Sequence, residues 1–228
     1  MGVFSNEPDY DRARILEAAS RARVRKRYRK ATTLYRRILA VEPNNPELHA
    51  RLAPMLAATG HPFDAWTSFE ACGRAALAEK KLDQAAAIYR EAARCLPREF
   101  QAWEKLARIE RQRTREKKAV EALLEGRQHF RRRSHRPQAI ALLRRALELS
   151  EWNLEIILDL SRLLARTGQQ SEAQLLLEQL GQRSGGANLR RVRWAQWRIS
   201  PTLLNTWRWL RAALSPEKNE PDLRRSHA

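Results

Sequence analysis

The sequence predicts an all-α protein, an α-solenoid of about twelve antiparallel helices. The chain is rich in Ala, Leu, Arg, Glu and Gln, which are good helix formers, and strand signals are almost absent. Apolar residues recur at a spacing of three and four in nearly every segment, as in helices that bury one face. A series of alanines also recurs, with gaps that alternate regularly between a longer and a shorter value. The series consists of Ala31, Ala65, Ala85, Ala119, Ala139 and Ala173.

One longer and one shorter gap together make the period of a regular super-repeat. Residues 24–77, 78–131 and 132–185 align as its three copies, in which Tyr35 coincides with Tyr89 and Leu143. A small residue followed one helical turn later by a large one suits two closely packed helices. Each copy is long enough for three helices of about a dozen residues joined by short turns.

The pattern places three helices in each copy of this three-helix super-repeat. The first helices are expected near residues 46–59, 100–112 and 154–167, the second near 62–79, 115–131 and 170–182, and the third near 28–41, 82–95 and 136–149. Pro43 and Pro97 follow two of the third helices, and Gly60 and Gly168 occupy equivalent turns. Pro54 falls inside an expected helix, where it predicts a kink or an early break.

Two further helices are expected at residues 187–199 and 202–214, separated by Ser200-Pro201. The predicted organisation is an N-terminal tail at 1–10, a helical repeat domain at 11–186, Trp- and Arg-rich capping helices at 187–215 and a disordered tail at 216–228. The last helix has one apolar face, which is predicted to cap the array. Trp209 lies off this face. That face consists of Leu203, Trp207, Leu210 and Leu214.

The repeat resembles the tetratricopeptide repeat (TPR) family, whose unit is an antiparallel helix pair of about 34 residues. The windows 66–99 and 100–133 match best. Their matching residues are Gly73, Ala85, Tyr89, Ala92 and Pro97 in the first window, and Trp103, Leu106, Ala107 and Ala119 in the second. Neighbouring windows overlap in this chain, so the middle helix of each copy belongs to two pairs.

The resemblance implies a non-catalytic scaffold or adaptor that mediates protein–protein interaction. Members of the family commonly hold a peptide or a partner helix in a groove lined by the first helices. Arg108 and Arg162 are equivalent residues one repeat apart, so they would point into one channel and grip carboxylates, unless they are ordinary solvated arginines. The residues placed in the groove in this way are Arg51, Lys105, Arg108, Asp159 and Arg162.

The formal net charge of +18, from 44 basic and 26 acidic residues, favours an anionic partner. An acidic protein is the preferred partner, and nucleic acid or an anionic membrane is the alternative; a compositional bias without function is also open. The alternative partners would use a basic edge made by two equivalent turns, or a C-terminal interface that otherwise serves as the cap. The basic edge comprises Arg25, Lys26, Arg27, Arg131, Arg132 and Arg133, and the C-terminal interface comprises Trp194, Trp197, Trp209 and Arg190.

Catalytic and cofactor signals are absent from the sequence. It has no Gly-rich phosphate loop, and its five histidines lack metal-ligand spacing, so no enzyme activity, metal or cofactor is expected. Cys72 and Cys95 are predicted to be free thiols in helices, as in a reducing compartment. The N-terminal residues lack a signal-peptide pattern and no long apolar window occurs, so a cytoplasmic location is expected.

Overall fold

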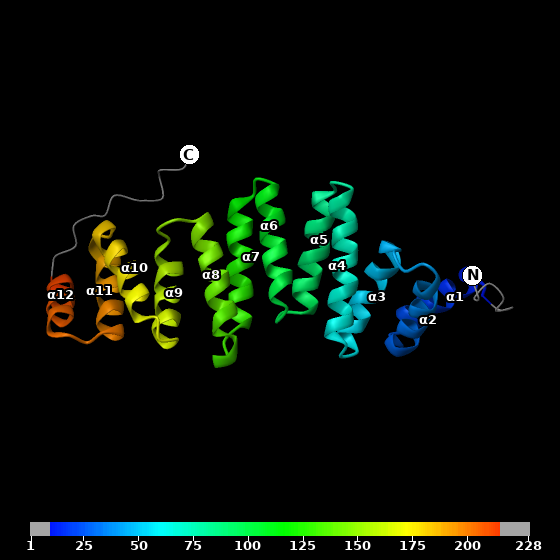
Figure 1. The fold of residues 1–228 in the computed structure, drawn as a ribbon, viewed down its shortest axis with the longest axis horizontal. Coiled ribbons are helices and arrows are strands. Elements are labelled where there is room, and N and C mark those ends of the chain that lie inside the picture. The colour runs from blue at the N-terminus through cyan, green and yellow to red at the C-terminus, as the bar shows by residue number, and fades with distance from the viewer. Residues whose placement is uncertain (1–9, 215–228) are drawn as a thin grey trace, which may run out of the picture. The chain divides into compact units, whose positions relative to one another are not determined.

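The computed structural model describes residues 10–214, which form twelve α-helices, one 3-10 turn (η1) and no strand (Figure 1). The predicted all-α solenoid class is confirmed. The predicted tails lie outside the described residues, apart from Tyr10. The elements are α1 (Arg12–Val24), α2 (Tyr28–Val41), α3 (Pro46–Ala58), α4 (Pro62–Ala78), α5 (Leu82–Cys95), α6 (Phe100–Gln112), α7 (Glu116–His129), η1 (Arg133–His135), α8 (Arg136–Leu149), α9 (Leu154–Arg166), α10 (Gln170–Arg183), α11 (Gly186–Ile199) and α12 (Leu203–Leu214).

The helices belong to two compact units, residues 1–122 and residues 123–228, and the boundary falls within α7. In the first unit each helix from α1 to α6 packs on the next one along the chain. In the second unit α8 to α12 do the same, and α9 also contacts α11. Each unit is therefore a stack of consecutive helix hairpins, as expected of repeats that bury their apolar faces against neighbours.

The three-helix super-repeat is visible in the positions of the helices. The third helices, α2, α5 and α8, each span 14 residues and begin at positions 28, 82 and 136. All six alanines of the recurring series have 0% exposed surface. A methyl group at these positions lets the backbones of neighbouring helices approach closely, which explains why the small residue recurs.

The turns repeat as well as the helices. Gly60, Thr114 and Gly168 occupy the same turn in successive copies, with φ of +84°, +57° and +86°. Only glycine adopts this left-handed backbone without cost, so the threonine copy is the strained one. The first helices share side-chain N-caps that the sequence analysis did not identify, at Asn45, Glu99 and Asn153.

The early break expected at Pro54 does not occur, because α3 continues through this residue to Ala58. Buried side chains lie on both sides of the proline, with Leu52, Met55 and Leu56 each 3% exposed or less. A proline inside a helix costs roughly 3 kcal/mol. The packing of these three apolar side chains outweighs that cost and holds the helix together.

The apolar face of the last helix was predicted to pack on the array, and this prediction is wrong. The exposed fractions of Leu203, Trp207, Leu210 and Leu214 are 92%, 65%, 40% and 82%. Trp209 instead stacks on Trp197 of α11, with ring centroids 6.0 Å apart and an interplanar angle of 23°. The spacing of apolar residues identified an apolar face correctly, but spacing carries no information on whether a neighbour covers that face.

Candidate protein-binding groove

A concave surface of the second unit lies between α9 and α11, which pack on each other and on α10. A cluster of buried apolar side chains holds the three helices together, and it consists of Ile157, Leu177, Leu180 and Val192. At the start of α9 the side chain of Asn153 accepts hydrogen bonds from the backbone N–H groups of Glu155 and Ile156. α11 starts at Gly186, whose φ of +44° lies in the left-handed region that favours glycine.

We call this surface the α9–α11 groove, and its volume is about 550 Å³. Five arginines and one tryptophan line it, and no carboxylate of the described residues does. Apolar side chains also line it, so a ligand would meet apolar surface as well as guanidinium groups. The lining residues are Leu158, Arg162, Ala165 and Arg166 of α9, Gln170 of α10, and Arg190, Arg191, Trp194, Ala195, Arg198 and Ile199 of α11.

Trp194 and Arg198 lie one turn apart on α11 and interact directly. The guanidinium carbon of Arg198 lies 4.7 Å from the centroid of the Trp194 ring, whose side chain is 42% exposed. This cation–π contact holds the guanidinium against the ring. One face of the ring is therefore already covered by the arginine, which leaves less room for a stacked base than for a carboxylate bound by Arg198.

Two carboxylates near the groove are already paired. The Nη1 atom of Arg191 lies 2.7 Å from the Oε1 atom of Glu155. The hydrogen bond from Arg191 lowers the pKa of Glu155, and burial has a smaller, opposite effect. Asp159 accepts a hydrogen bond of 2.9 Å from Arg127 and lies 3.7 Å from Arg162.

Two other arginines of the groove, Arg166 and Arg198, have no carboxylate partner among the described residues. Within residues 10–214 no ion pair involves the guanidinium group of Arg166 or Arg198. The groove therefore keeps an excess of positive charge for a ligand.

The groove brings together residues that the sequence analysis assigned to two separate sites. Arg162 was expected in the partner-binding groove, and Arg190 and Trp194 were expected in the C-terminal interface, yet all three line one surface. Trp197 and Trp209 are absent from the lining because they stack on each other.

Three arginines of the groove, Arg166, Arg191 and Arg198, were not among the expected site residues. A spacing of four places Arg166 one turn after Arg162, and it places Arg198 one turn after Trp194. This spacing is the signal in the sequence that would have identified Arg166 and Arg198.

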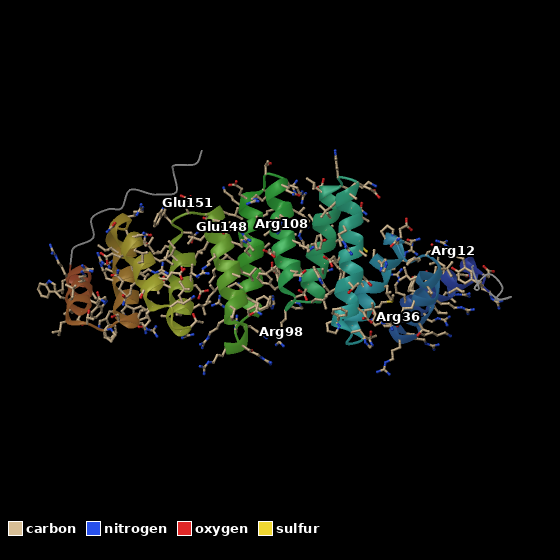
Figure 2. The ribbon with its side chains drawn as sticks, in the orientation of Figure 1. Arg12, Arg36, Arg98, Arg108, Glu148 and Glu151 are labelled. Carbon is tan, nitrogen blue, oxygen red and sulfur yellow. The ribbon has the colours of Figure 1, made fainter. Side chains whose placement is uncertain are left out.

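The other expected groove residues lie in the first unit. Arg51 of α3 and Arg108 of α6 are exposed, and Figure 2 labels Arg108. Lys105 is half-buried, donates to Glu70 at 2.9 Å and lies 5.9 Å from the centroid of the Tyr89 ring. Because Arg108 and Arg162 belong to different units, a shared channel between them stays a prediction.

The six residues of the predicted basic edge are all exposed and lie in turns between helices. Lys26 adopts a φ of +56° between α1 and α2, and Arg131 donates to the backbone oxygen of Gln128 at 3.0 Å after α7. The two groups belong to different units, so their alignment along one edge also stays a prediction.

Metal-binding and membrane-spanning features are also absent from the described part of the chain. Between Tyr10 and Leu214, no three residues of the types His, Cys, Asp and Glu are grouped so that they could hold a metal ion. None of the described helices combines the length and the apolar character that crossing a bilayer requires.

Comparison with known proteins gives a family match in the second unit. A family model described as tetratricopeptide repeat matches residues 136–192, which include α8, α9 and α10 and the first part of α11. No curated protein matches the chain significantly in sequence.

Several solved structures are similar to the chain. A crystal structure of the MamA protein shares 15% identity, covers 75% of this chain and 90% of that one, and has a TM-score of 0.30. The Pseudomonas aeruginosa pilF structure shares 16% identity, with 89% of each chain covered and a TM-score of 0.30. A tetratricopeptide repeat protein from Parabacteroides merdae shares 11% identity, with 88% and 90% covered and a TM-score of 0.32. The match shows tetratricopeptide repeat sequence at residues 136–192, and both units contain the consecutive helix hairpins that such repeats form.

Proposed function

We propose that the protein is a non-catalytic scaffold that binds an acidic segment of a partner protein in the α9–α11 groove. The observation that carries this proposal is the lining of the groove, with five arginines, one exposed tryptophan and no lining carboxylate among the described residues. Arginine binds carboxylates through two parallel N–H donors, so a groove of this kind suits Asp and Glu side chains. The free thiols of Cys72 and Cys95 support a reducing compartment such as the cytoplasm.

The apolar part of the lining favours a protein segment over a simple polyanion. Leu158, Ala195 and Ile199 line the groove together with the arginines, and Trp194 is 42% exposed. An apolar or aromatic residue of the ligand would bury surface there while neighbouring carboxylates pair with the rim. Nucleic acid would also gain from the charge, but Arg198 already covers one face of the Trp194 ring, which leaves at most one face for a stacked base.

The proposal is tested with a labelled peptide in which Asp alternates with Pro around a single Tyr. Proline keeps this peptide extended, so the peptide imitates a segment that lies along a groove. Fluorescence anisotropy with the full chain should show binding that weakens with salt. Replacing two arginines of the groove, in Arg162→Glu/Arg166→Glu, should weaken binding by at least about tenfold, since 1.4 kcal/mol corresponds to that factor.

Arg132→Glu/Arg133→Glu is the matched control, because it makes the same charge change in the same unit outside the groove. It should leave peptide affinity within about twofold, the range of a remote surface charge. Equal loss in the groove variant and in Arg132→Glu/Arg133→Glu would show that only net charge matters and would reject the groove. Binding of single-stranded RNA more tightly than the peptide would favour nucleic acid instead.

A further inference from the structure

The last helix exposes a narrow apolar stripe that the groove does not use. Leu203, Trp207, Leu210 and Leu214 follow a spacing of four, three and four residues along α12. At 3.6 residues per turn, these four positions fall within about 60° of the helix surface. Their exposed fractions run from 40% for Leu210 to 92% for Leu203, so the described residues leave much of the stripe uncovered. We call these four residues the α12 seam.

The opposite side of α12 is the side that packs in the second unit. Trp209 stacks on Trp197 of α11, and Arg208 contacts Glu178 of α10 at 3.2 Å. The helix is thereby fixed with its seam turned away from α11. Because a stack of helix hairpins grows by adding one helix to an exposed apolar face, the seam is the surface on which one more helix would pack.

The spacing of the stripe indicates the kind of occupant. The alternating spacing of four and three is that of the two core positions of a heptad, which form the contact between two helices. Leu204, which is 58% exposed, lies beside the stripe and widens the exposed apolar surface of α12. The regular spacing, and not the width, therefore favours a partner helix.

The charge around the seam indicates the chemistry of that helix. Residues 186–214 contain six arginines and no acidic or lysine residue. Glu155 and Glu178 neutralise part of this charge from α9 and α10, through Arg191, Arg193 and Arg208. The remaining positive field would repel a second copy of this chain, which carries the same arginines and a net charge of +18.

The occupant that we infer follows from the spacing of the seam and from the charge around it. We propose that the α12 seam binds a helix of another protein that carries an apolar heptad stripe flanked by acidic residues. This surface is distinct from the α9–α11 groove, and neither proposal depends on the other.

The test uses the full chain and a labelled synthetic peptide of three heptads, with Leu at the two core positions and Glu at the two flanking positions. The glutamates keep the peptide from pairing with itself at neutral pH. A second peptide carries Lys in place of Glu. Anisotropy should show binding of the acidic peptide and no measurable binding of the basic one.

Variants separate the seam from the rest of the chain. Trp207→Ser and Leu210→Ser should each lower the affinity for the acidic heptad peptide by about tenfold or more, because each removes a large apolar contact. Leu175→Ser on α10, where the leucine is 59% exposed, is the matched control and should leave affinity unchanged. The groove variant Arg162→Glu/Arg166→Glu should still bind the heptad peptide. This result distinguishes failure of the seam proposal from failure of the groove proposal. Circular dichroism confirms that each variant is folded.

Three results would overturn the proposal. The first is affinity for the acidic heptad peptide that does not change in Trp207→Ser and Leu210→Ser. The second is a dimer in sedimentation that dissociates in Leu210→Ser, which would make a second copy the occupant. The third is binding to phosphatidylserine vesicles that is lost in Trp207→Ser, without binding of the acidic peptide, which would assign the seam to a membrane surface.

Discussion

Glu110 accepts a hydrogen bond of 2.5 Å from Arg90 while its own side chain is only 1% exposed. Arg113, itself 11% exposed, donates to the same carboxylate at 3.1 Å. In the other two copies of the super-repeat, the position of Glu110 holds Leu56 and Leu164, which are both fully buried. The middle copy thus replaces an apolar contact with a buried ion pair, and such pairs often contribute little net stability because both groups lose hydration.

Exchanging this ion pair for the residues of its neighbours should be nearly neutral, whereas breaking it should be costly. Glu110→Ala is expected to lower the free energy of unfolding by about 3 kcal/mol, since Arg113 stays buried and keeps only Asp83. Glu110→Leu/Arg113→Thr, which copies Leu56 and Thr59, should stay within about 1 kcal/mol of the native chain or exceed it. Urea unfolding measures both variants. Equal destabilisation of the two would show that the ion pair itself holds α6 in place.

Gly73 of α4 lies directly under the ring of Tyr89 of α5. A Cβ atom at position 73 would stand 2.4 Å from the Cζ atom of Tyr89, whose side chain is fully buried and unable to move away. Gly73→Ala should therefore lower the free energy of unfolding by about 2 kcal/mol, although alanine favours a helix by about 1 kcal/mol.

Gly181 is the matched control for Gly73, two repeats further along the chain. A Cβ atom there would meet the guanidinium carbon of Arg193 at 3.4 Å, and this flexible side chain can yield. Gly181→Ala should be neutral or stabilising by up to about 1 kcal/mol. Thermal unfolding of the two variants gives the comparison, and a Gly73→Ala chain as stable as Gly181→Ala would contradict the close packing of Tyr89.

The contact between Glu155 and Arg191 should make stability depend weakly on acid pH. The hydrogen bond from Arg191 lowers the pKa of Glu155 in the folded state, so the contact stabilises the protein above the ordinary carboxyl pKa and is lost as pH falls through the lowered value. The two side chains are 69% and 47% exposed, which limits the effect to less than about 1 kcal/mol. In Arg191→Gln, carboxyl titration by NMR should return the pKa of Glu155 towards its ordinary range. An unchanged titration would remove Arg191 as the cause.

The two thiols should differ in reactivity. Burial raises the pKa of Cys72 to about 12, and its thiol donates to the backbone oxygen of Pro46 at 3.2 Å. Cys95 is only half-buried, and burial raises its pKa as well. Alkylation at pH 8 should therefore modify Cys95 first, by about tenfold or more in rate, because the thiolate and its access control the reaction. Cys95→Ser isolates Cys72, which should then react only in denaturant. Rapid reaction of Cys72 in the folded variant would contradict its burial.

The helices could be predicted from the sequence because every copy repeats the same spacing of apolar residues. The starts of α2, α5 and α8 at positions 28, 82 and 136 agree with the expected helices, and the recurring alanines are buried as expected. Local rules were sufficient for these features, since helix propensity, turn residues and apolar spacing all favour the same structure.

Features that depend on tertiary neighbours could not be predicted in this way. From the sequence, Glu110 would be expected to be a solvated residue of an amphipathic helix. It is buried because it pairs with Arg90 and Arg113, and Arg90 belongs to the preceding helix, α5. Trp194 and Arg162 were assigned to different sites because nothing in the spacing shows that α9 and α11 pack side by side. Trp209 likewise gains its partner only when α12 folds back onto α11.

α12 has a single sequential neighbour, α11, whereas α9, α10 and α11 each pack between two. In a linear array, local opening is easiest where a helix has one interface to lose, so the backbone amides of α12 should exchange with solvent before those of α10. A helix bound to Leu203 and Leu210 would supply the second interface. The concentration of that helix would then set the fraction of molecules in which α12 is folded onto α11. Docking of α12 and binding of the partner would be linked equilibria.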